Sequence, residues 1–261
     1  MPTCTRRPFL TALAATAAGG FLASAFGRSA HAAATSSRAP KILVFDVAET
    51  LLNIDSLAPF FSSVFGNPQI VHEWFGQTIL YAETATVTKS FISFSEVTAG
   101  VLRMVGKIHG VSISAAQIEE LGSGLAALPP YPDVPEGLRS LKQAGYRLVT
   151  LTDSAAHPHA GAFKAAGLDG LFDREFSAET VHRFKPARET YQQVAEQMRV
   201  APDSLCMIAA HPWDLIGAQR AGCSTALIAR KNVAPFLIHG VAPPDIVGTT
   251  LPEVATALMR A

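Results

Sequence analysis

The sequence contains no aspartate or glutamate before Asp46, although this stretch contains several arginines. It has the order of a targeting segment: the adjacent pair Arg6 and Arg7, an apolar run rich in alanine and glycine, and an A-x-A cleavage pattern. We therefore predict a twin-arginine-type signal peptide over residues 1–32 and a linker over residues 33–40. Such a signal exports a folded protein and predicts a periplasmic location. A single membrane anchor is the alternative.

The rest of the chain has no second apolar run long enough to cross a bilayer, so we predict no membrane span after signal cleavage. It also has no basic stripe, which argues against nucleic acid as a partner. Of only three cysteines, Cys4 lies in the leader, and Cys206 and Cys223 have neither C-x-x-C nor metal-ligand spacing. These two thiols either pair in an oxidising compartment or remain separately buried.

What the body does contain is a regular succession of short apolar runs and helical segments. Residues 42–45 form a continuous apolar run, typical of a strand buried on both faces. Residues 57–128 show helical spacing without clear strands and predict a helical cap. After the proline-rich stretch "PPYPDVPEG", helices and strands alternate, which predicts a parallel, doubly wound sheet. We therefore predict an α/β fold with a Rossmann-like core, residues 41–56 and 129–261, and a cap inserted after the first strand.

Polar residues follow the predicted strands at one edge of the sheet, where such folds bind ligands. They are Asp46, Thr50, Thr152, Asp153, Lys185, His211 and Asp214. Each alone would be typical of a turn, a helix cap or a solvated loop, so the hypothesis depends on their joint occurrence. Together they predict covalent catalysis by Asp46, which Lys185 keeps ionised. Asp214 or His211 would then activate water to break an ester intermediate.

Four segments resemble the motifs of the haloacid dehalogenase superfamily: "FDVAETL", "LVTLTDS", "RFKPARETY" and "AAHPWDLIGAQRAG". The body is most similar to type II 2-haloacid dehalogenases, including the cap-like "EWFGQTILYAETATVTKSFISF". The resemblance implies hydrolytic dehalogenation of a small 2-haloacid, or a related halogenated compound, through an ester on Asp46. It implies that Lys185 is the charge partner, that Thr50 and Thr152 position carboxylates, and that Asp214 prepares the water. We expect a small-molecule substrate, neither metal nor cofactor, and, from the resemblance, a homodimer.

The substrate side departs from the family pattern. Ala48 stands where many dehalogenases have tyrosine, and Phe75 stands where the cap arginine would bind the halide. Asp153 and His211 each replace an asparagine, whereas Tyr191 matches the family tyrosine. We expect these five residues to contribute to substrate binding. The loss of a cation and the gain of a carboxylate predict weak binding of an anionic haloacid, unless protonated His211 restores positive charge.

Two other functions compete with dehalogenation. A metal-dependent phosphatase of the superfamily needs an acid two residues after the nucleophile, and here that residue is Ala48. The first acid of the fourth motif is also replaced, by Ala210, and Mg²⁺ prefers several oxygen ligands. An exported binding protein without catalysis is the second rival. The intact Asp46 and Lys185 argue against it, and the altered substrate side argues for it.

Overall fold

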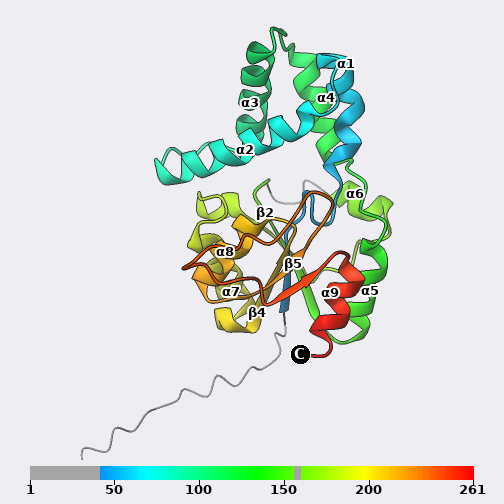
Figure 1. Ribbon diagram of the computed structural model, residues 1–261, viewed down its shortest axis with the longest axis vertical. Coiled ribbons are helices and arrows are strands. Elements are labelled where there is room, and N and C mark those ends of the chain that lie inside the picture. The colour runs from blue at the N-terminus through cyan, green and yellow to red at the C-terminus, as the bar shows by residue number, and fades with distance from the viewer. Residues whose placement is uncertain (1–41, 156–159) are drawn as a thin grey trace, which may run out of the picture. The chain divides into compact units, whose positions relative to one another are not determined.

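The computed structural model describes residues 42–155 and 160–261, and the predicted signal peptide and linker lie outside the described residues. In the described part, six parallel strands form one sheet in the order β3-β2-β1-β4-β5-β6 (Figure 1). This confirms the predicted doubly wound α/β core. The strands are β1 (Ile42–Phe45), β2 (Arg147–Thr152), β3 (Arg174–Ser177), β4 (Leu205–Ala209), β5 (Ser224–Ile228) and β6 (Ile246–Gly248).

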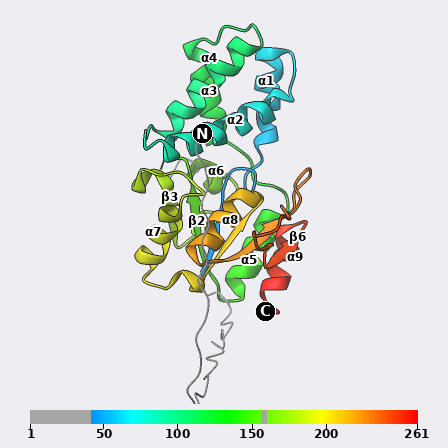
Figure 2. The ribbon, with the colours of Figure 1, turned by 60° about the vertical axis from the view of Figure 1, so that its left-hand side comes forward.

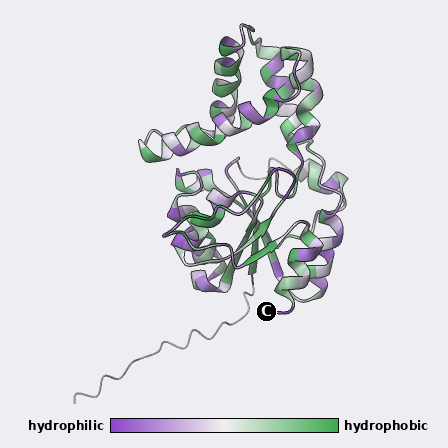
Figure 3. Ribbon diagram, in the orientation of Figure 1, coloured by the Kyte–Doolittle hydropathy of each residue, from purple (hydrophilic) through white to green (hydrophobic). Residues whose placement is uncertain are grey.

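Strand β1 is apolar throughout because helices cover both faces of the sheet. Leu43 and Phe45 pack into the cluster that includes α5, α6 and α9, whereas Ile42 and Val44 pack against α7 and α8. Successive side chains of a strand point to opposite faces, so each face receives two of them. The strands accordingly form the hydrophobic centre of the core in Figure 3. The covering helices are α5 (Val134–Gln143), α6 (Ala160–Ala165), α7 (Arg188–Met198), α8 (Pro212–Ala221) and α9 (Leu251–Leu258).

A helical cap follows β1, as predicted (Figures 1 and 2). Its local sequence defines the helix ends: Ser93 and Glu96 form a capping box, as do Ser114 and Gln117. Gly66 ends the first cap helix with φ 71°, a conformation that favours glycine. The cap helices are α1 (Ala58–Phe65), α2 (Ile70–Val87), α3 (Phe94–Ile108) and α4 (Ala115–Ala126). Short 3-10 helices are η1 (Ile54–Leu57), η2 (Ala178–Val181) and η3 (Pro202–Ser204).

Cap and core are joined by hydrogen bonds near the predicted site. The backbone N–H of Phe94 donates to Glu179 Oε1 over 2.6 Å. The backbone N–H of Phe184, one residue before the predicted catalytic lysine, donates to Thr86 Oγ1 over 2.8 Å. Within the described residues no helix has both the length and the apolar character needed to cross a membrane.

The two cysteines of the body are separate thiols, although they lie near neighbouring strands. Cys206 belongs to β4, Cys223 precedes β5, and both are buried and free. Burial raises the pKa of each thiol to about 12, so neither is a reactive thiolate at neutral pH. The structure therefore favours the second of the two sequence interpretations.

Candidate active site

The strand register brings the predicted site residues to one edge of the sheet. Phe45, the last residue of β1, pairs with Thr150 of β2 and Ile208 of β4. The backbone N–H of Asp46 continues the ladder and donates to the carbonyl of Ile208 over 3.0 Å. Residues that follow β1, β2 and β4 therefore emerge at the same level, as expected for parallel strands.

Lys185 links two carboxylates at this edge. Its Nζ lies 2.6 Å from Asp46 Oδ1 and 2.7 Å from Asp214 Oδ2, and its side chain is 1% exposed. Burial lowers the pKa of Lys185, but the negative charges of Asp214 and Asp46 outweigh burial and raise it above its ordinary value. Lys185 is therefore a permanent ammonium ion at neutral pH.

The two carboxylates differ in their response to this single cation. Burial raises the pKa of Asp46, but the charge of Lys185 and the contact with His211 outweigh it and hold the pKa well below the usual range. Burial dominates at Asp214, where the pKa is raised. Asp46 is therefore the carboxylate that keeps its charge most firmly, which is the state a nucleophile requires.

Thr50 and Tyr191 hold these two carboxylates in place. Thr50 Oγ1 donates to Asp46 Oδ2 over 2.6 Å and accepts the backbone N–H of Ala210 over 2.8 Å. It therefore connects the turn after β1 to the end of β4. Tyr191 is buried, and its hydroxyl donates to Asp214 Oδ1 over 2.7 Å. This contact assigns Tyr191 to orienting Asp214, and we propose this positioning role in place of the expected substrate contact.

The two residues at the end of β2 also serve the framework. Asp153 Oδ1 accepts the backbone N–H of Lys185 over 2.8 Å, and burial raises the pKa of Asp153 to about 7. The Thr152 hydroxyl oxygen accepts the backbone N–H of Ser154 over 3.3 Å. Asp153 therefore orders the loop that contains Lys185. Among the described residues, the hydroxyl of Thr152 contacts the backbone N–H of Ser154 and not a carboxylate. The expected substrate contact of Asp153 gives way to a positioning role, which we propose.

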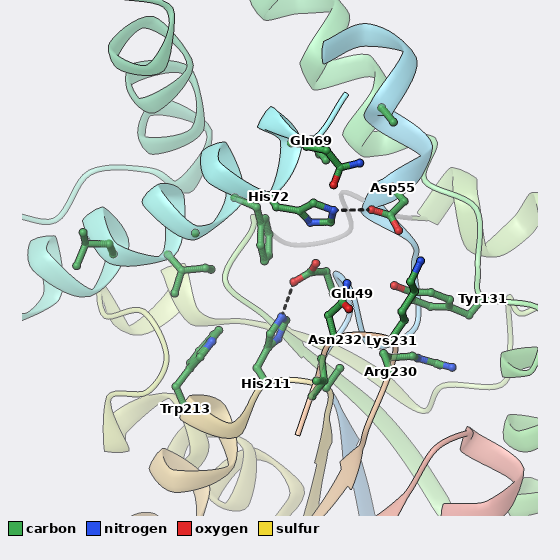
Figure 4. A pocket seen from close by; sticks show the side chains of 18 of the residues that line it. Glu49, Asp55, Gln69, His72, Tyr131, His211, Trp213, Arg230, Lys231 and Asn232 are labelled. Carbon is green, nitrogen blue, oxygen red and sulfur yellow. Dashed lines mark hydrogen bonds and ion pairs between the residues drawn. The ribbon is translucent and has the colours of Figure 1, made fainter. Parts of the chain in front are cut away.

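His211 lies between two carboxylates on the cap side of Asp46. Its Nδ1 is 3.0 Å from Asp46 Oδ2 and its Nε2 is 2.9 Å from Glu49 Oε2 (Figure 4). Two carboxylates facing both ring nitrogens require both nitrogens to donate, which describes an imidazolium ion. Burial lowers the pKa of His211, but the hydrogen bonds to Asp46 and Glu49 outweigh it and raise the pKa to about 10. The ring also stacks on Phe75 and Trp213, with centroids 5.9 and 5.0 Å away.

Glu49 is a site residue that the sequence analysis did not identify. Its backbone has φ 60°, a left-handed conformation that is uncommon for glutamate and costs about 1 kcal/mol or more. Its backbone N–H donates to the carbonyl of Leu52 over 2.7 Å, which closes the turn after the nucleophile. The sequence does show an acid in the turn that follows Asp46, and that was the available signal. Only the backbone conformation of Glu49 in the structure shows that its carboxylate contacts His211.

Arg230 is a second residue identified only by the structure. Its Nη1 contacts both carboxylate oxygens of Asp133, at 2.7 and 2.8 Å. Its Nη2 donates to the carbonyl of Thr50 over 2.8 Å, so the guanidinium supports the turn that contains Thr50. The planar guanidinium also lies over the ring of Tyr131, 4.1 Å from the centroid. These contacts make Arg230 a structural cation of the site.

Two cavities lie near Asp46, and Phe75 lines both. The larger, of about 1050 Å³, has both polar and apolar walls, and its polar side chains include Glu49 and His211 (Figure 4). The smaller, of about 240 Å³, is lined by Ala48 and by residues of the cap. Asp46 itself is 5% exposed and lines neither cavity, although its neighbours line both. Ala48, Phe75 and His211 therefore line cavities next to Asp46, and their expected contact with substrate stays a prediction.

Comparison with known proteins decides the family. The haloacid dehalogenase-like hydrolase family matches residues 40–222, which include Asp46, Lys185, His211 and Asp214. The chain belongs to this family. The sequence-based recognition is thus confirmed, and so is the fold that it implied.

Among the curated relatives, (S)-2-haloacid dehalogenase 4A from Burkholderia cepacia is 28% identical over 194 residues, covering 74% of this chain and 84% of the relative. A solved dehalogenase structure superposes with a TM-score of 0.78 at 26% identity and covers 86% of this chain and 99% of its own. The L-2-haloacid dehalogenase from Xanthobacter autotrophicus, solved with chloropropionic acid covalently bound, has a TM-score of 0.76 at 22% identity, covering 84% and 98%. That last likeness shows the fold alone.

Proposed function

We propose that this hydrolase cleaves the carbon–halogen bond of a small halogenated compound, such as a 2-haloacid, through a covalent ester on Asp46. The observation that carries the proposal is the 2.6 Å contact between Lys185 Nζ and Asp46 Oδ1 at the carboxyl end of β1. It keeps a nucleophilic carboxylate charged in a buried site. The Burkholderia relative is an (S)-2-haloacid dehalogenase, which supports the same chemistry here.

The reaction divides into two displacements. In the first, an oxygen lone pair of Asp46 forms a C–O bond with the substrate carbon, and the halide leaves with the electron pair of the C–X bond. In the second, water attacks the carbonyl carbon of the Asp46 ester, and the bond between that carbonyl carbon and the alkoxy oxygen breaks. The alkoxy oxygen takes a proton, and the products are a hydroxy compound, a halide ion, one proton and regenerated Asp46.

His211 is better placed than Asp214 to activate that water. Asp214 is fully buried, and its two carboxylate oxygens accept hydrogen bonds from Lys185 and Tyr191. His211 lines the larger cavity, and its Nδ1 lies 3.0 Å from Asp46 Oδ2. Esterification removes the Asp46 charge that helps to keep the imidazolium protonated, so the pKa of His211 falls after the first step. Once the ring has given up its proton, it can accept a proton from water.

One observation favours the rival function of ligand binding without catalysis. Asp46 lines neither cavity, and its two oxygens accept hydrogen bonds from Lys185 and Thr50. Catalysis therefore requires substrate to reach Asp46 between the two cavities, next to His211. A binding protein would need no such access, and its affinity for ligand would not depend on the Asp46 charge.

The phosphatase alternative fits the donor set poorly. Ala48 supplies no acid to protonate a leaving alcohol, and Ala210 supplies no carboxylate to a cation. Both Asp46 and Asp214 are already paired with the ammonium of Lys185. The chemistry of these residues matches an internal lysine cation rather than a magnesium site.

A combined assay tests the proposal. Halide release is measured with 2-chloropropanoate and 2-bromopropanoate, and the intact protein mass is followed after rapid quenching. We expect halide release and a transient ester adduct that peptide mapping places on Asp46. Asp46→Asn should release no halide. Turnover without any adduct on Asp46 would contradict the nucleophile assignment, and binding that is unchanged in Asp46→Asn without turnover would select the binding protein.

We also propose that the enzyme acts after export, since Arg6 and Arg7 precede an apolar, acid-free run. Cell fractionation of the full chain tests this. The mature protein should be in the periplasmic fraction, and the double variant Arg6→Lys/Arg7→Lys should retain uncleaved protein in the cytoplasm. Equal export of both forms would contradict a twin-arginine route.

A further inference from the structure

We propose that the smaller cavity, lined by Ala48 and Phe75, is a substrate subsite for an uncharged alkyl or aryl group carried by the halogen-bearing carbon. This inference rests on the proposed function and names its substrate class. The substrates would be halogenated compounds with an apolar substituent of up to about phenyl size, rather than the smallest haloacids.

The walls of this cavity are suited to apolar groups. It is lined by aliphatic and aromatic side chains, a few hydroxyls and no ionisable side chain among the described residues. A charged substituent placed there would lose its hydration without gaining an ionic partner, which is costly. The lining residues are Ala48, Trp74, Phe75, Phe94, Ser95, Thr98, Ala99, Ile118, Leu121, Gly122, Leu125, Ala126, Leu128, Ser154 and Ala155.

The position of the cavity connects it to the reacting atoms. Ala48 is two residues after Asp46 in the same turn, and its side chain ends at Cβ, so it leaves space beside the nucleophile. Phe75 forms another wall and stacks on His211, which contacts Asp46. A group bonded to the carbon under attack by Asp46 would therefore enter this cavity past Ala48 and Phe75, which line it.

The size of the cavity sets the size of the substituent. Its volume is about 240 Å³. An engineered apolar cavity of about 150 Å³ in another protein binds benzene, so a phenyl ring or a chain of several methylenes fits here. The larger cavity, with Glu49, His72, His211 and Lys231 on its walls, is the polar alternative and would accept the charged or hydrated end of the substrate.

A chain-length series tests the subsite. The probes are 2-bromopropanoate, 2-bromobutanoate, 2-bromohexanoate and 2-bromo-2-phenylacetate, with 2-bromobutanedioate as a charged comparison. We expect kcat/KM for halide release to rise roughly threefold to fourfold with each added methylene, because each buried methylene contributes about 0.8 kcal/mol. The dicarboxylate should be a poorer substrate than 2-bromobutanoate.

Three helix-interior glycines provide matched variants. Gly122 lines the smaller cavity, Gly76 lines the larger one, and Gly100 lines neither. A Cβ built on any of the three meets no atom within 4 Å, so each position has open space at the first side-chain atom. Leucine also favours helix over glycine, and circular dichroism and thermal unfolding check that each variant is folded.

The decisive quantity is the ratio of kcat/KM for 2-bromohexanoate to that for 2-bromopropanoate. We expect Gly122→Leu to lower this ratio at least tenfold, and Gly76→Leu and Gly100→Leu to leave it unchanged. A flat or falling chain-length profile overturns the subsite while leaving dehalogenation intact. A fall of the ratio in Gly76→Leu instead also overturns it, because the chain would then occupy the larger cavity.

Measurements of ligand binding distinguish failure of the subsite from failure of the proposed dehalogenation. Titration calorimetry with hexanoate, propanoate and phenylacetate reports the subsite without chemistry. Weaker binding of hexanoate and phenylacetate, but not of propanoate, to Gly122→Leu supports the subsite even if no halide is ever released. Absence of halide release from all probes would overturn dehalogenation alone, and equal binding of hexanoate and propanoate to the wild type would overturn the subsite.

Discussion

The two sides of the Asp46 carboxylate are built in different ways. On the core side, a network is formed by Lys185, Asp214, Thr50 and Tyr191. Each of these side chains makes a hydrogen bond or ion pair of 2.6 or 2.7 Å to Asp46 or within the group. We call these four residues and Asp46 the strand-end network. On the cap side there are two cavities, whose walls include Ala48 and the Phe75 ring. The Glu49–His211 pair lines the larger one (Figure 4).

From this difference we propose that the strand-end network determines the chemistry and that the cap side determines substrate selectivity. The strand-end network matches what the family resemblance implied for a carboxylate nucleophile with a lysine partner. The cap side holds the departures at Ala48, Phe75 and His211. Substitutions in the network should therefore affect catalysis or stability strongly, whereas substitutions on the cap side should alter rates of single steps, substrate choice or pH response.

The largest expected effect is that of Asp46→Asn. The amide cannot act as a nucleophile, so kcat for halide release should fall at least about a thousandfold. Steady-state halide assays on the folded variant measure the loss, and intact mass spectrometry should show no ester adduct. Retention of more than a tenth of the wild-type rate would mean that another group attacks the substrate.

Lys185→Met should produce the largest loss of stability. The change leaves the carboxylates of Asp46 and Asp214 buried without a cation, which costs about 3–5 kcal/mol for a buried pair that loses one partner. Urea unfolding followed by circular dichroism measures the free energy of unfolding. The double variant Lys185→Met/Asp214→Asn is the control, and it should recover part of the loss because it removes one unpaired charge. No recovery would show that packing of the lysine stem, not charge, is responsible.

The strand-end network could be predicted from the sequence because its placement follows from local patterns. Each short apolar run ends in a polar residue, and parallel strands bring these ends to one edge. Asp214 was predicted close to the end of a later strand and Lys185 in a loop before a helix, and Lys185 lies 2.6 Å from Asp46 and 2.7 Å from Asp214.

The cap side could not be predicted in the same detail. Whether Glu49 faces His211 depends on one backbone angle, φ 60°, which no periodicity encodes. The smaller cavity depends on how residues of α2, α3 and α4 pack above Ala48, and packing of distant segments is not a local property. The hydrogen bonds of Tyr191 to Asp214 and of Asp153 to the backbone of Lys185 likewise required coordinates, and their expected contact with substrate stays a prediction.

His211→Asn tests the assignment of water activation on the cap side. Loss of the base should slow ester hydrolysis about a hundredfold while the first displacement continues, so the Asp46 adduct should accumulate. Rapid-quench mass spectrometry measures the fraction of esterified enzyme against wild type. Asp214→Asn is the comparison: if that variant, and not His211→Asn, accumulates adduct, the base is Asp214.

The smallest expected effect is that of Glu49→Gln, which is seen in the pH dependence of stability. The folded-state pKa of His211 is raised to about 10, above its unfolded value of 6.5, by the contacts with Asp46 and Glu49. The stabilisation from the imidazolium is therefore complete below pH 6.5 and is lost as the pH rises towards 10. Glu49→Gln keeps the shape of the side chain but removes its charge, which lowers the folded-state pKa of His211, so the loss still begins near pH 6.5 but should be complete at a lower pH. Urea midpoints measured from pH 6 to 10 would show the shift.

Glu49→Gly provides the matched backbone control, since glycine adopts φ 60° without strain and should recover about 1 kcal/mol that Glu49→Gln does not. An unchanged pH profile in both variants would mean that Asp46 alone holds the proton on His211, and the cap side would then contribute no charge to the state of the site.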